Sequence, residues 1–139
     1  MRSLHQKVIV GLAAGLLVGL LPVPASAEGT VDTTTSIRKA QRRRAVVFYG
    51  TLVVDFAEDA SPDAEGCLED RAVQVWRDSR GRDKRVPGVV HTQEDGSWAG
   101  RLTGKLDGKF YAKVTKEVFS DRYGELVTCS PARSRAVRV

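Results

Sequence analysis

The residues best suited to chemistry are few and widely spaced. His91 is the only histidine downstream of His5, so a Ser–His–Asp arrangement would have to include it. The alternation around it predicts a surface position on a strand. Adjacent acids that could perform acid–base chemistry occur at Glu58–Asp59, Glu69–Asp70 and Glu94–Asp95. Neighbours on a strand face opposite sides of a sheet, which does not favour acid–base pairs at these positions. The sequence also has neither a Gly-rich phosphate loop nor the residue order of a calcium-binding EF-hand loop. We therefore predict no catalytic residue, no metal site and no cofactor, and we expect a non-enzymatic protein.

The chain has two cysteines, Cys67 and Cys129. In an exported protein, an even pair of cysteines predicts a disulfide. Zinc is an alternative, but two thiols and His91 do not complete the usual four-ligand site. A catalytic thiol would need a base, and His91 is again the only candidate. We therefore predict a structural Cys67–Cys129 disulfide.

The N-terminal segment has the pattern of a secretory signal peptide. Basic residues at positions 2 and 7 precede the apolar run Val8–Leu21, and Ala25–Ala27 supplies a small-residue cleavage site. An uncleaved anchor is the alternative, but the run is short for a span of about 20 residues. We predict that 1–27 is removed, leaving a secreted, extracellular protein without a membrane span. Losing two cations lowers the formal charge of +5 to +3, which does not favour nucleic-acid binding, and we expect a monomer.

Residues 28–44 are predicted to form a flexible leader. Glu28–Ser36 is polar and rich in threonine, and Ile37–Arg44 is strongly basic. A solvated linker is the simplest interpretation, whereas an anchor to an anionic envelope polymer and a second processing site are alternatives. If the segment is an anchor, its contacts with the anionic surface are made by Arg42, Arg43 and Arg44.

Residues 45–139 carry the strand pattern of an all-β domain. Apolar residues alternate along Ala45–Phe56, where Gly50 suggests a bulge or a close backbone approach. Further runs follow at short intervals, and Asp95–Gly96 favours a tight hairpin turn between two of them. About seven strands predict a small antiparallel β-sandwich of the prealbumin or immunoglobulin-like type. The predicted core consists of Phe48, Leu52, Val54, Val73, Val75, Val90, Trp98, Leu102, Phe110, Ala112, Val114, Val137 and Val139.

Three residues outside this core suggest a ligand face: Trp76, Tyr111 and Lys113. Planar rings beside hydrogen-bonding side chains can form a binding platform. This interpretation corresponds to a module that binds cell-envelope carbohydrate. The alternative is a small second cluster covered by the leader or by long loops.

Several short motifs resemble those of known modules. Ala72–Val75 is followed by Asp95-Gly96-Ser97-Trp98 and then by Gly108–Val114. This order resembles prealbumin-like modules, such as carboxypeptidase regulatory-like and collagen-adhesin B-type repeats, over roughly residues 45–139. The resemblance implies an accessory, non-enzymatic module with a structural or protein-interaction role. Adhesin-type repeats often contain a Lys–Asn isopeptide bond, but this chain has no asparagine, so a cystine would have to replace it.

Overall fold

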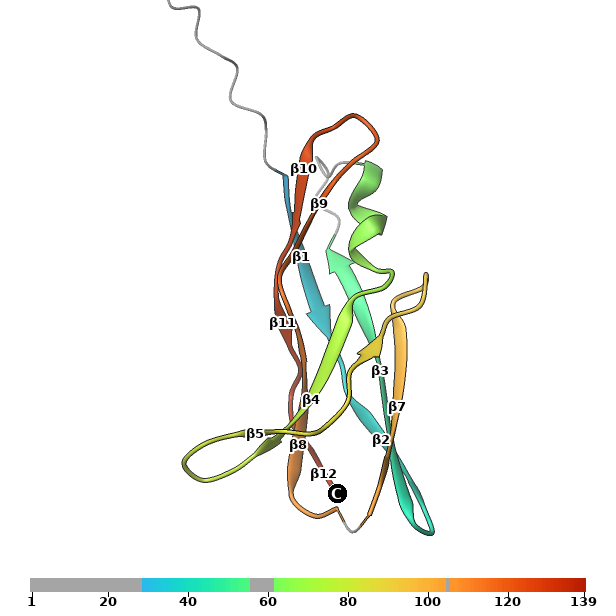
Figure 1. Cartoon of the computed structure of the whole chain (residues 1–139), viewed down its shortest axis with the longest axis vertical. Coiled ribbons are helices and arrows are strands. Elements are labelled where there is room, and N and C mark those ends of the chain that lie inside the picture. Colours follow the sequence, from blue (N-terminus) through green and yellow to red (C-terminus); the bar gives the residue numbers. More distant parts are fainter. Residues whose placement is uncertain (1–28, 56–61, 105) are drawn as a thin grey trace, which may run out of the picture.

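The computed structural model describes residues 29–55, 62–104 and 106–139, and the predicted signal peptide lies outside them (Figure 1). The fold is all-β, as predicted, with two six-stranded sheets. The first sheet contains β1 (Gly29–Thr35), β2 (Arg38–Arg42), β3 (Ala45–Asp55), β7 (Ser97–Thr103), β9 (Glu117–Ser120) and β10 (Leu126–Cys129). The second contains β4 (Ala72–Asp78), β5 (Lys84–Arg85), β6 (Val90–His91), β8 (Lys109–Val114), β11 (Ala132–Arg133) and β12 (Val137–Arg138). A short 3₁₀ helix, η1 (Pro62–Cys67), precedes β4.

The described residues form more strands than predicted, and one pair of them is parallel. Twelve strands replace the expected seven or so, and several contain only two residues. β1 runs parallel to β10, whereas the other pairs are antiparallel. The expectation of a purely antiparallel arrangement is therefore wrong for this pair. Side-chain alternation indicates which face a residue occupies, but it does not reveal the direction of a distant partner strand.

The polar half of the predicted leader is built into the first sheet as β1. Val31 and Thr33 are buried, whereas Asp32 and Thr34 are exposed. Thr33 donates its hydroxyl hydrogen to the carbonyl oxygen of Ser130 at 2.6 Å, and its amide donates to the Ser130 hydroxyl oxygen at 2.9 Å. Threonine is β-branched and favours extended backbone, so this polar run is also good strand sequence.

The basic half of the predicted leader forms β2, whose five residues all pair with β3. Because β3 supplies its hydrogen-bond partners, β2 needs little apolar surface of its own. The flexible leader expected over 28–44 is thus replaced by strands over 29–35 and 38–42. Ser36 lies between these two strands and passes close to Gly50 of β3. A Cβ atom on Gly50 would lie 2.0 Å from the carbonyl oxygen of Ser36, so the predicted close backbone approach at Gly50 is confirmed.

The Asp95–Gly96 turn is present, but it connects the two sheets. Gly96 has a φ of +77° and donates its amide to the carbonyl oxygen of Gln93 at 2.9 Å. Before the turn β6 pairs with β4, and after it β7 pairs with β3. Turn type is set by local residues, whereas strand partners are set by the whole fold. The prediction of a tight turn at Asp95–Gly96 is therefore correct, whereas the prediction that the flanking strands pair with each other as a hairpin is wrong.

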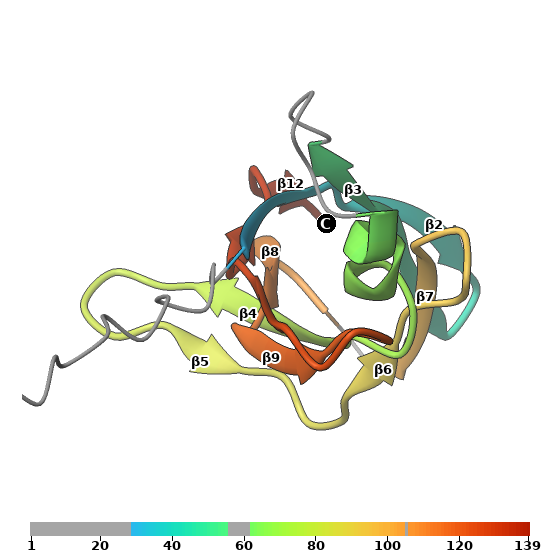
Figure 2. The same cartoon turned by 90° about the horizontal axis from the view of Figure 1, so that it is seen from above.

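The main core lies between the two sheets (Figure 2). Phe48 of β3 and Phe110 of β8 meet there, with ring centroids 5.2 Å apart. Nine of the thirteen predicted core residues are buried, so alternation identified the inner faces correctly. The other four are partly buried and pack against the same cluster: Val90, Leu102, Val137 and Val139.

A second cluster lies beneath η1, at the opposite end of the molecule from the β2–β3 turn (Figure 1). Cys67 and Cys129 are fully buried in it and are bonded to each other, which confirms the predicted disulfide. Because Cys67 ends η1 and Cys129 ends β10, the bond fastens the helix to the first sheet.

Arg71, beside this disulfide, is buried to 1% exposure, which the sequence did not indicate. Its Nη1 donates to the carbonyl oxygen of Cys67 at 3.0 Å, and its Nη2 donates to those of Thr115 at 2.8 Å and Ser130 at 3.2 Å. Its Nε lies 3.2 Å from Oε2 of Glu117, an ion-pair distance without hydrogen-bond geometry. Burial lowers the pKa of Arg71, while the Glu117 charge raises it.

The disulfide closes a sequence separation of 62 residues. Chain entropy predicts that the double variant C67A/C129A loses about 4 kcal/mol of unfolding free energy, measurable by urea denaturation. Wild-type protein unfolded under reducing conditions is the control, because it keeps both sulfur atoms in place. Free thiols in the purified oxidised protein would contradict the prediction.

Replacing Arg71 with Met should lower the unfolding free energy by about 3–5 kcal/mol, because three carbonyl groups lose a buried donor. The matched control is Arg77→Met, whose ion pair with Asp107 is largely exposed and contributes less than about 1 kcal/mol. Urea denaturation of both variants measures the difference. Equal losses of unfolding free energy in the two variants would show that the three buried hydrogen bonds of Arg71 do not stabilise the fold.

Candidate functional site

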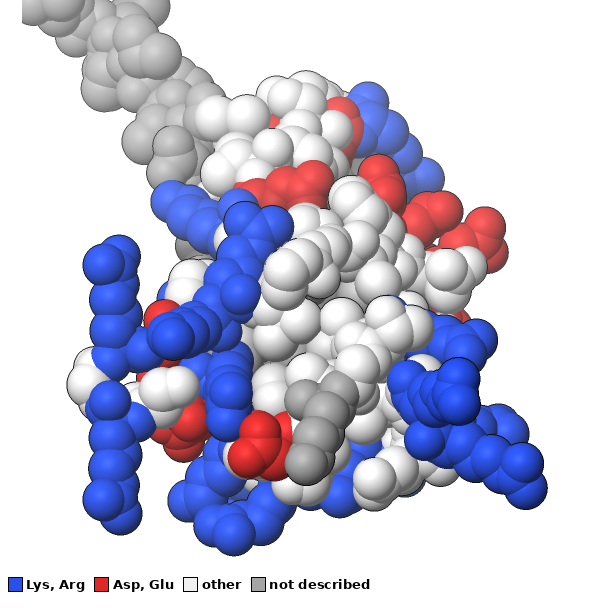
Figure 3. All heavy atoms as spheres, turned by 60° about the horizontal axis from the view of Figure 1, so that its bottom comes forward, with Lys and Arg blue, Asp and Glu red and all other residues white. Residues whose placement is uncertain are grey.

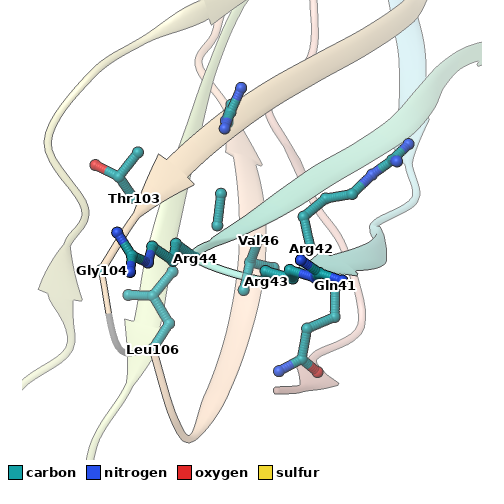
Figure 4. Close-up of a pocket in the computed structure, with 10 residues that line it drawn as sticks. Gln41, Arg42, Arg43, Arg44, Val46, Thr103, Gly104 and Leu106 are labelled. Carbon is teal, nitrogen blue, oxygen red and sulfur yellow. The ribbon is translucent and has the colours of Figure 1, made fainter.

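A basic concavity lies where the β2–β3 turn meets the end of β7 (Figure 4). We use this name for the hollow of about 680 Å³ that is lined by Arg42, Arg43, Arg44 and Arg101, among others. In Figure 4, Arg44 extends toward Gly104, whereas Arg42 extends to the opposite side. The three predicted contact residues at 42–44 and Arg101 line one hollow, and Arg42 and Arg44 point to different sides of it.

Strand pairing explains how four arginines come to line one hollow. Arg42 ends β2 opposite Ala45, which leaves Arg43 and Arg44 as the turn. On the other side of β3, Arg101 pairs with Val47 and lies on the same outer face. The amide of Gly104 donates to the carbonyl oxygen of Arg44 at 3.4 Å, which fastens the turn to β7.

These four arginines are available for an external anion. All four are exposed, and none of them forms an ion pair with any acid among the described residues. Guanidinium groups bind carboxylates and phosphates through paired hydrogen bonds. The arrangement can therefore hold an anionic group.

The basic character extends beyond the concavity. Viewed toward this end, Lys and Arg side chains lie on both sides of the molecule (Figure 3). One flank is the β2–β3 turn. The other is the β4–β5 loop with the start of β5, where Arg80, Arg82 and Lys84 lie. Glu65 of η1 lies at the opposite end of the molecule from this turn (Figure 1), so it does not neutralise the turn.

The predicted aromatic face is assembled, but it is largely covered. Trp76 and Tyr111 are paired on adjacent strands, and Nζ of Lys113 lies 5.2 Å from the Trp76 ring centroid. However, Tyr111 is only 3% exposed, because Arg133 stacks 3.8 Å from its ring centroid and Asp83 accepts a hydrogen bond from its hydroxyl at 2.8 Å. The structure favours the covered-cluster alternative for Tyr111.

Burial raises the pKa of Tyr111, and its hydrogen bond to Asp83 acts in the same direction. The same bond lowers the pKa of Asp83 below its ordinary value of 3.8, with help from the amide of Ser79. The β4–β5 loop is therefore fastened over the aromatic pair by a bond between a neutral phenol and an ionised carboxylate.

His91 does not assemble a triad with the acids considered above. Its Nδ1 lies 2.8 Å from Oδ1 of Asp70, but both side chains are more than half exposed. Asp95 instead pairs with the hydroxyl and amide of Ser97, which lower the pKa of that carboxyl. No cluster of three or more His, Cys, Asp or Glu residues suited to a metal ion occurs in the described part of the chain.

Arg101 is the functional candidate that sequence analysis missed. Its signal was the alternation in β7, where Trp98, Gly100 and Leu102 face inward and Arg101 must face outward. That signal places Arg101 on a surface, but its closeness to the β2–β3 turn depends on the pairing of β7 with β3.

Comparisons of this chain with protein-family models, curated protein sequences and solved structures found no match. The resemblance to prealbumin-like modules therefore remains an expectation. Among the described residues, no helix is long and apolar enough to cross a membrane.

Replacing Tyr111 with Phe should cost about 1 kcal/mol of unfolding free energy near neutral pH, because Asp83 loses a hydrogen bond. A depressed carboxyl pKa contributes stability above the ordinary carboxyl pKa, and this contribution is lost as pH falls through the pKa of the folded state. The difference between wild type and Tyr111→Phe should therefore shrink in acid. Urea denaturation at several pH values measures it, with Tyr49→Phe as the control, and a constant difference would contradict the prediction.

Proposed function

We propose that this chain is a non-enzymatic binding module that docks on an anionic partner through its basic concavity. In this proposal it is secreted after cleavage following Ala27, and its two sheets form a sandwich of the prealbumin-like type. The observation that supports docking most directly is that Arg42, Arg43, Arg44 and Arg101 surround one hollow without an acidic partner among the described residues.

Like-charge crowding at this end has a physical cost that a purely structural role does not require. Exposed charges of one sign repel one another, and an anionic partner relieves that repulsion while gaining several ion pairs. Each exposed pair contributes little alone, so affinity depends on several guanidinium groups acting on one polyanion. The proposed role is thus a multivalent attachment that weakens as ionic strength rises.

The carbohydrate-binding alternative has less support. It needs open aromatic faces for sugar rings, yet Arg133 already occupies one side of Tyr111 and Lys113 lies over Trp76. Opening the platform would break the Tyr111–Asp83 hydrogen bond. A protein or polymer that presents negative charge therefore suits the described surface better than a neutral sugar chain.

The triple variant R42S/R43S/R44S should bind long-chain polyphosphate about tenfold more weakly than wild type at low salt, since three exposed ion pairs are lost. Its melting temperature should stay nearly unchanged, because these side chains are exposed. Titration by fluorescence anisotropy at several salt concentrations measures both the affinity and its salt dependence.

The matched control is R80S/R82S/K84S, which removes the same charge from three exposed residues in the β4–β5 loop and at the start of β5. A smaller loss of affinity in this control would support docking at the concavity. Equal losses in the two triple variants would indicate a diffuse charge effect and contradict the proposed site. Polyphosphate binding that does not respond to salt would also contradict it.

A further inference from the structure

One side of β7 carries backbone groups that the described strands leave unpaired. β7 is hydrogen-bonded to β3 alone. The amide of Leu52 donates to the carbonyl oxygen of Gly96, and that of Gly104 donates to the carbonyl oxygen of Arg44. In an antiparallel pair, alternate residues face the partner, so the even-numbered residues of β7 face β3. The N–H and C=O groups of Ala99, Arg101 and Thr103 therefore point away from the sheet.

An apolar cleft opens beside this edge. It has a volume of about 240 Å³ and lies between β7 and the segment Val86–Val90. Its deeper wall includes Phe48, Val73 and Val75, which belong to the core. Segment 86–89 contains Pro87 and lies outside the strands of either sheet, and the cleft beside it reaches core residues. The cleft could hold an apolar side chain from outside.

The charge around the cleft selects the kind of occupant. Arg101 is the only charged residue that lines it within the described part of the chain, and the same Arg101 also lines the basic concavity. Arg85 directly precedes the opposite wall and is exposed. A ligand that follows the edge from the cleft toward Thr103 therefore meets Arg101 and then Arg44.

We propose that the free edge of β7 binds an extended acidic segment of a partner protein by strand addition. The segment forms backbone hydrogen bonds with Ala99, Arg101 and Thr103, places one apolar side chain in the cleft, and directs its carboxylates to the basic concavity. Main-chain pairing supplies affinity in this binding mode, and the pocket beside the edge supplies specificity. This inference rests on the proposed function, because it identifies the anionic partner as an acidic peptide.

The edge distinguishes a peptide from other amphipathic anions. An anionic lipid surface would satisfy the arginines and the apolar cleft, but it offers no regular row of donors and acceptors to β7. A second copy of β7, placed antiparallel about Arg101, would bring two like charges together. An acidic peptide is the occupant that satisfies the backbone edge, the cleft and the arginines at once.

The test uses a fluorescent nine-residue peptide with acidic ends and a centre of alternating threonine and valine. The matched peptide has the same sequence but carries N-methyl groups on alternate backbone nitrogens, which removes donors without changing charge. We expect the unmodified peptide to bind at least about tenfold more tightly, since several backbone hydrogen bonds are lost in the other. Equal affinity for the two peptides would overturn strand addition.

The protein variants are Thr103→Pro and Thr103→Ala. Proline at 103 removes an outward N–H without removing a bond to β3, whereas alanine keeps it. Peptide affinity should fall about fivefold to tenfold in T103P relative to T103A. Thr103 also lines the basic concavity, so polyphosphate affinity is compared between the same two variants, which both lack the hydroxyl, and it should differ much less. If T103P fails to fold, Ala99→Pro replaces it with wild type as its reference, because proline at 99 also removes an outward N–H and Ala99 lines neither hollow.

The outcomes separate this inference from the proposed function. Polyphosphate binding that depends on 42–44, together with equal affinity for the two peptides, would overturn strand addition and leave the basic site intact. Loss of both activities in wild type would overturn both proposals. Binding to phosphatidylglycerol vesicles but to neither peptide would assign the surface to a membrane and overturn the peptide partner.

Discussion

Arg71 occupies the junction on which the arrangement of the two sheets depends. Its guanidinium donates to carbonyl groups at the end of η1, in the β8–β9 connection and directly after β10. Without this guanidinium, these buried carbonyl oxygens would lack a donor, and each would cost free energy comparable to a lost hydrogen bond. Ser130 also accepts from Thr33, so β1 joins the same network. The Cys67–Cys129 bond lies beside it and holds two of the linked segments together.

This junction gives the molecule two unlike ends. At the η1 end, a disulfide, a buried cation and a small apolar cluster restrict motion together. At the other end, β2 and β3 project as a two-stranded turn rich in arginine, and the segment before β6 covers the core incompletely. Regions with fewer buried contacts open at lower free energy. A binding surface is therefore more adaptable at the basic end, while the disulfide-bonded η1 end preserves the register of both sheets.

Local sequence predicted those features that depend on local physics. The alternation of Phe110, Ala112 and Val114 identified a buried face, and Asp95–Gly96 identified a turn. The disulfide was predictable because two thiols and His91 cannot complete the usual zinc site. The threonines of β1 were predicted to lie in a flexible leader because they are polar, whereas their strand propensity favours β structure. The contacts of Thr33 with Ser130, which are not visible in the local sequence, favour the strand. The burial of Arg71, the cover over Tyr111 and the approach of Arg101 to the β2–β3 turn all require partners far away in sequence.

The tie between Thr33 and Ser130 joins residues that lie 97 positions apart. The parallel pairing of β1 with β10 spans a similar stretch of chain. A chain that emerges from its N-terminus therefore presents β1 long before its partner exists, and loop-closure entropy delays the pairing further. Until β10 arrives, one side of β1 remains an open template for other strands. The order of synthesis thus makes the final third of the sequence the step that completes the first sheet, and a truncated chain would be prone to aggregate.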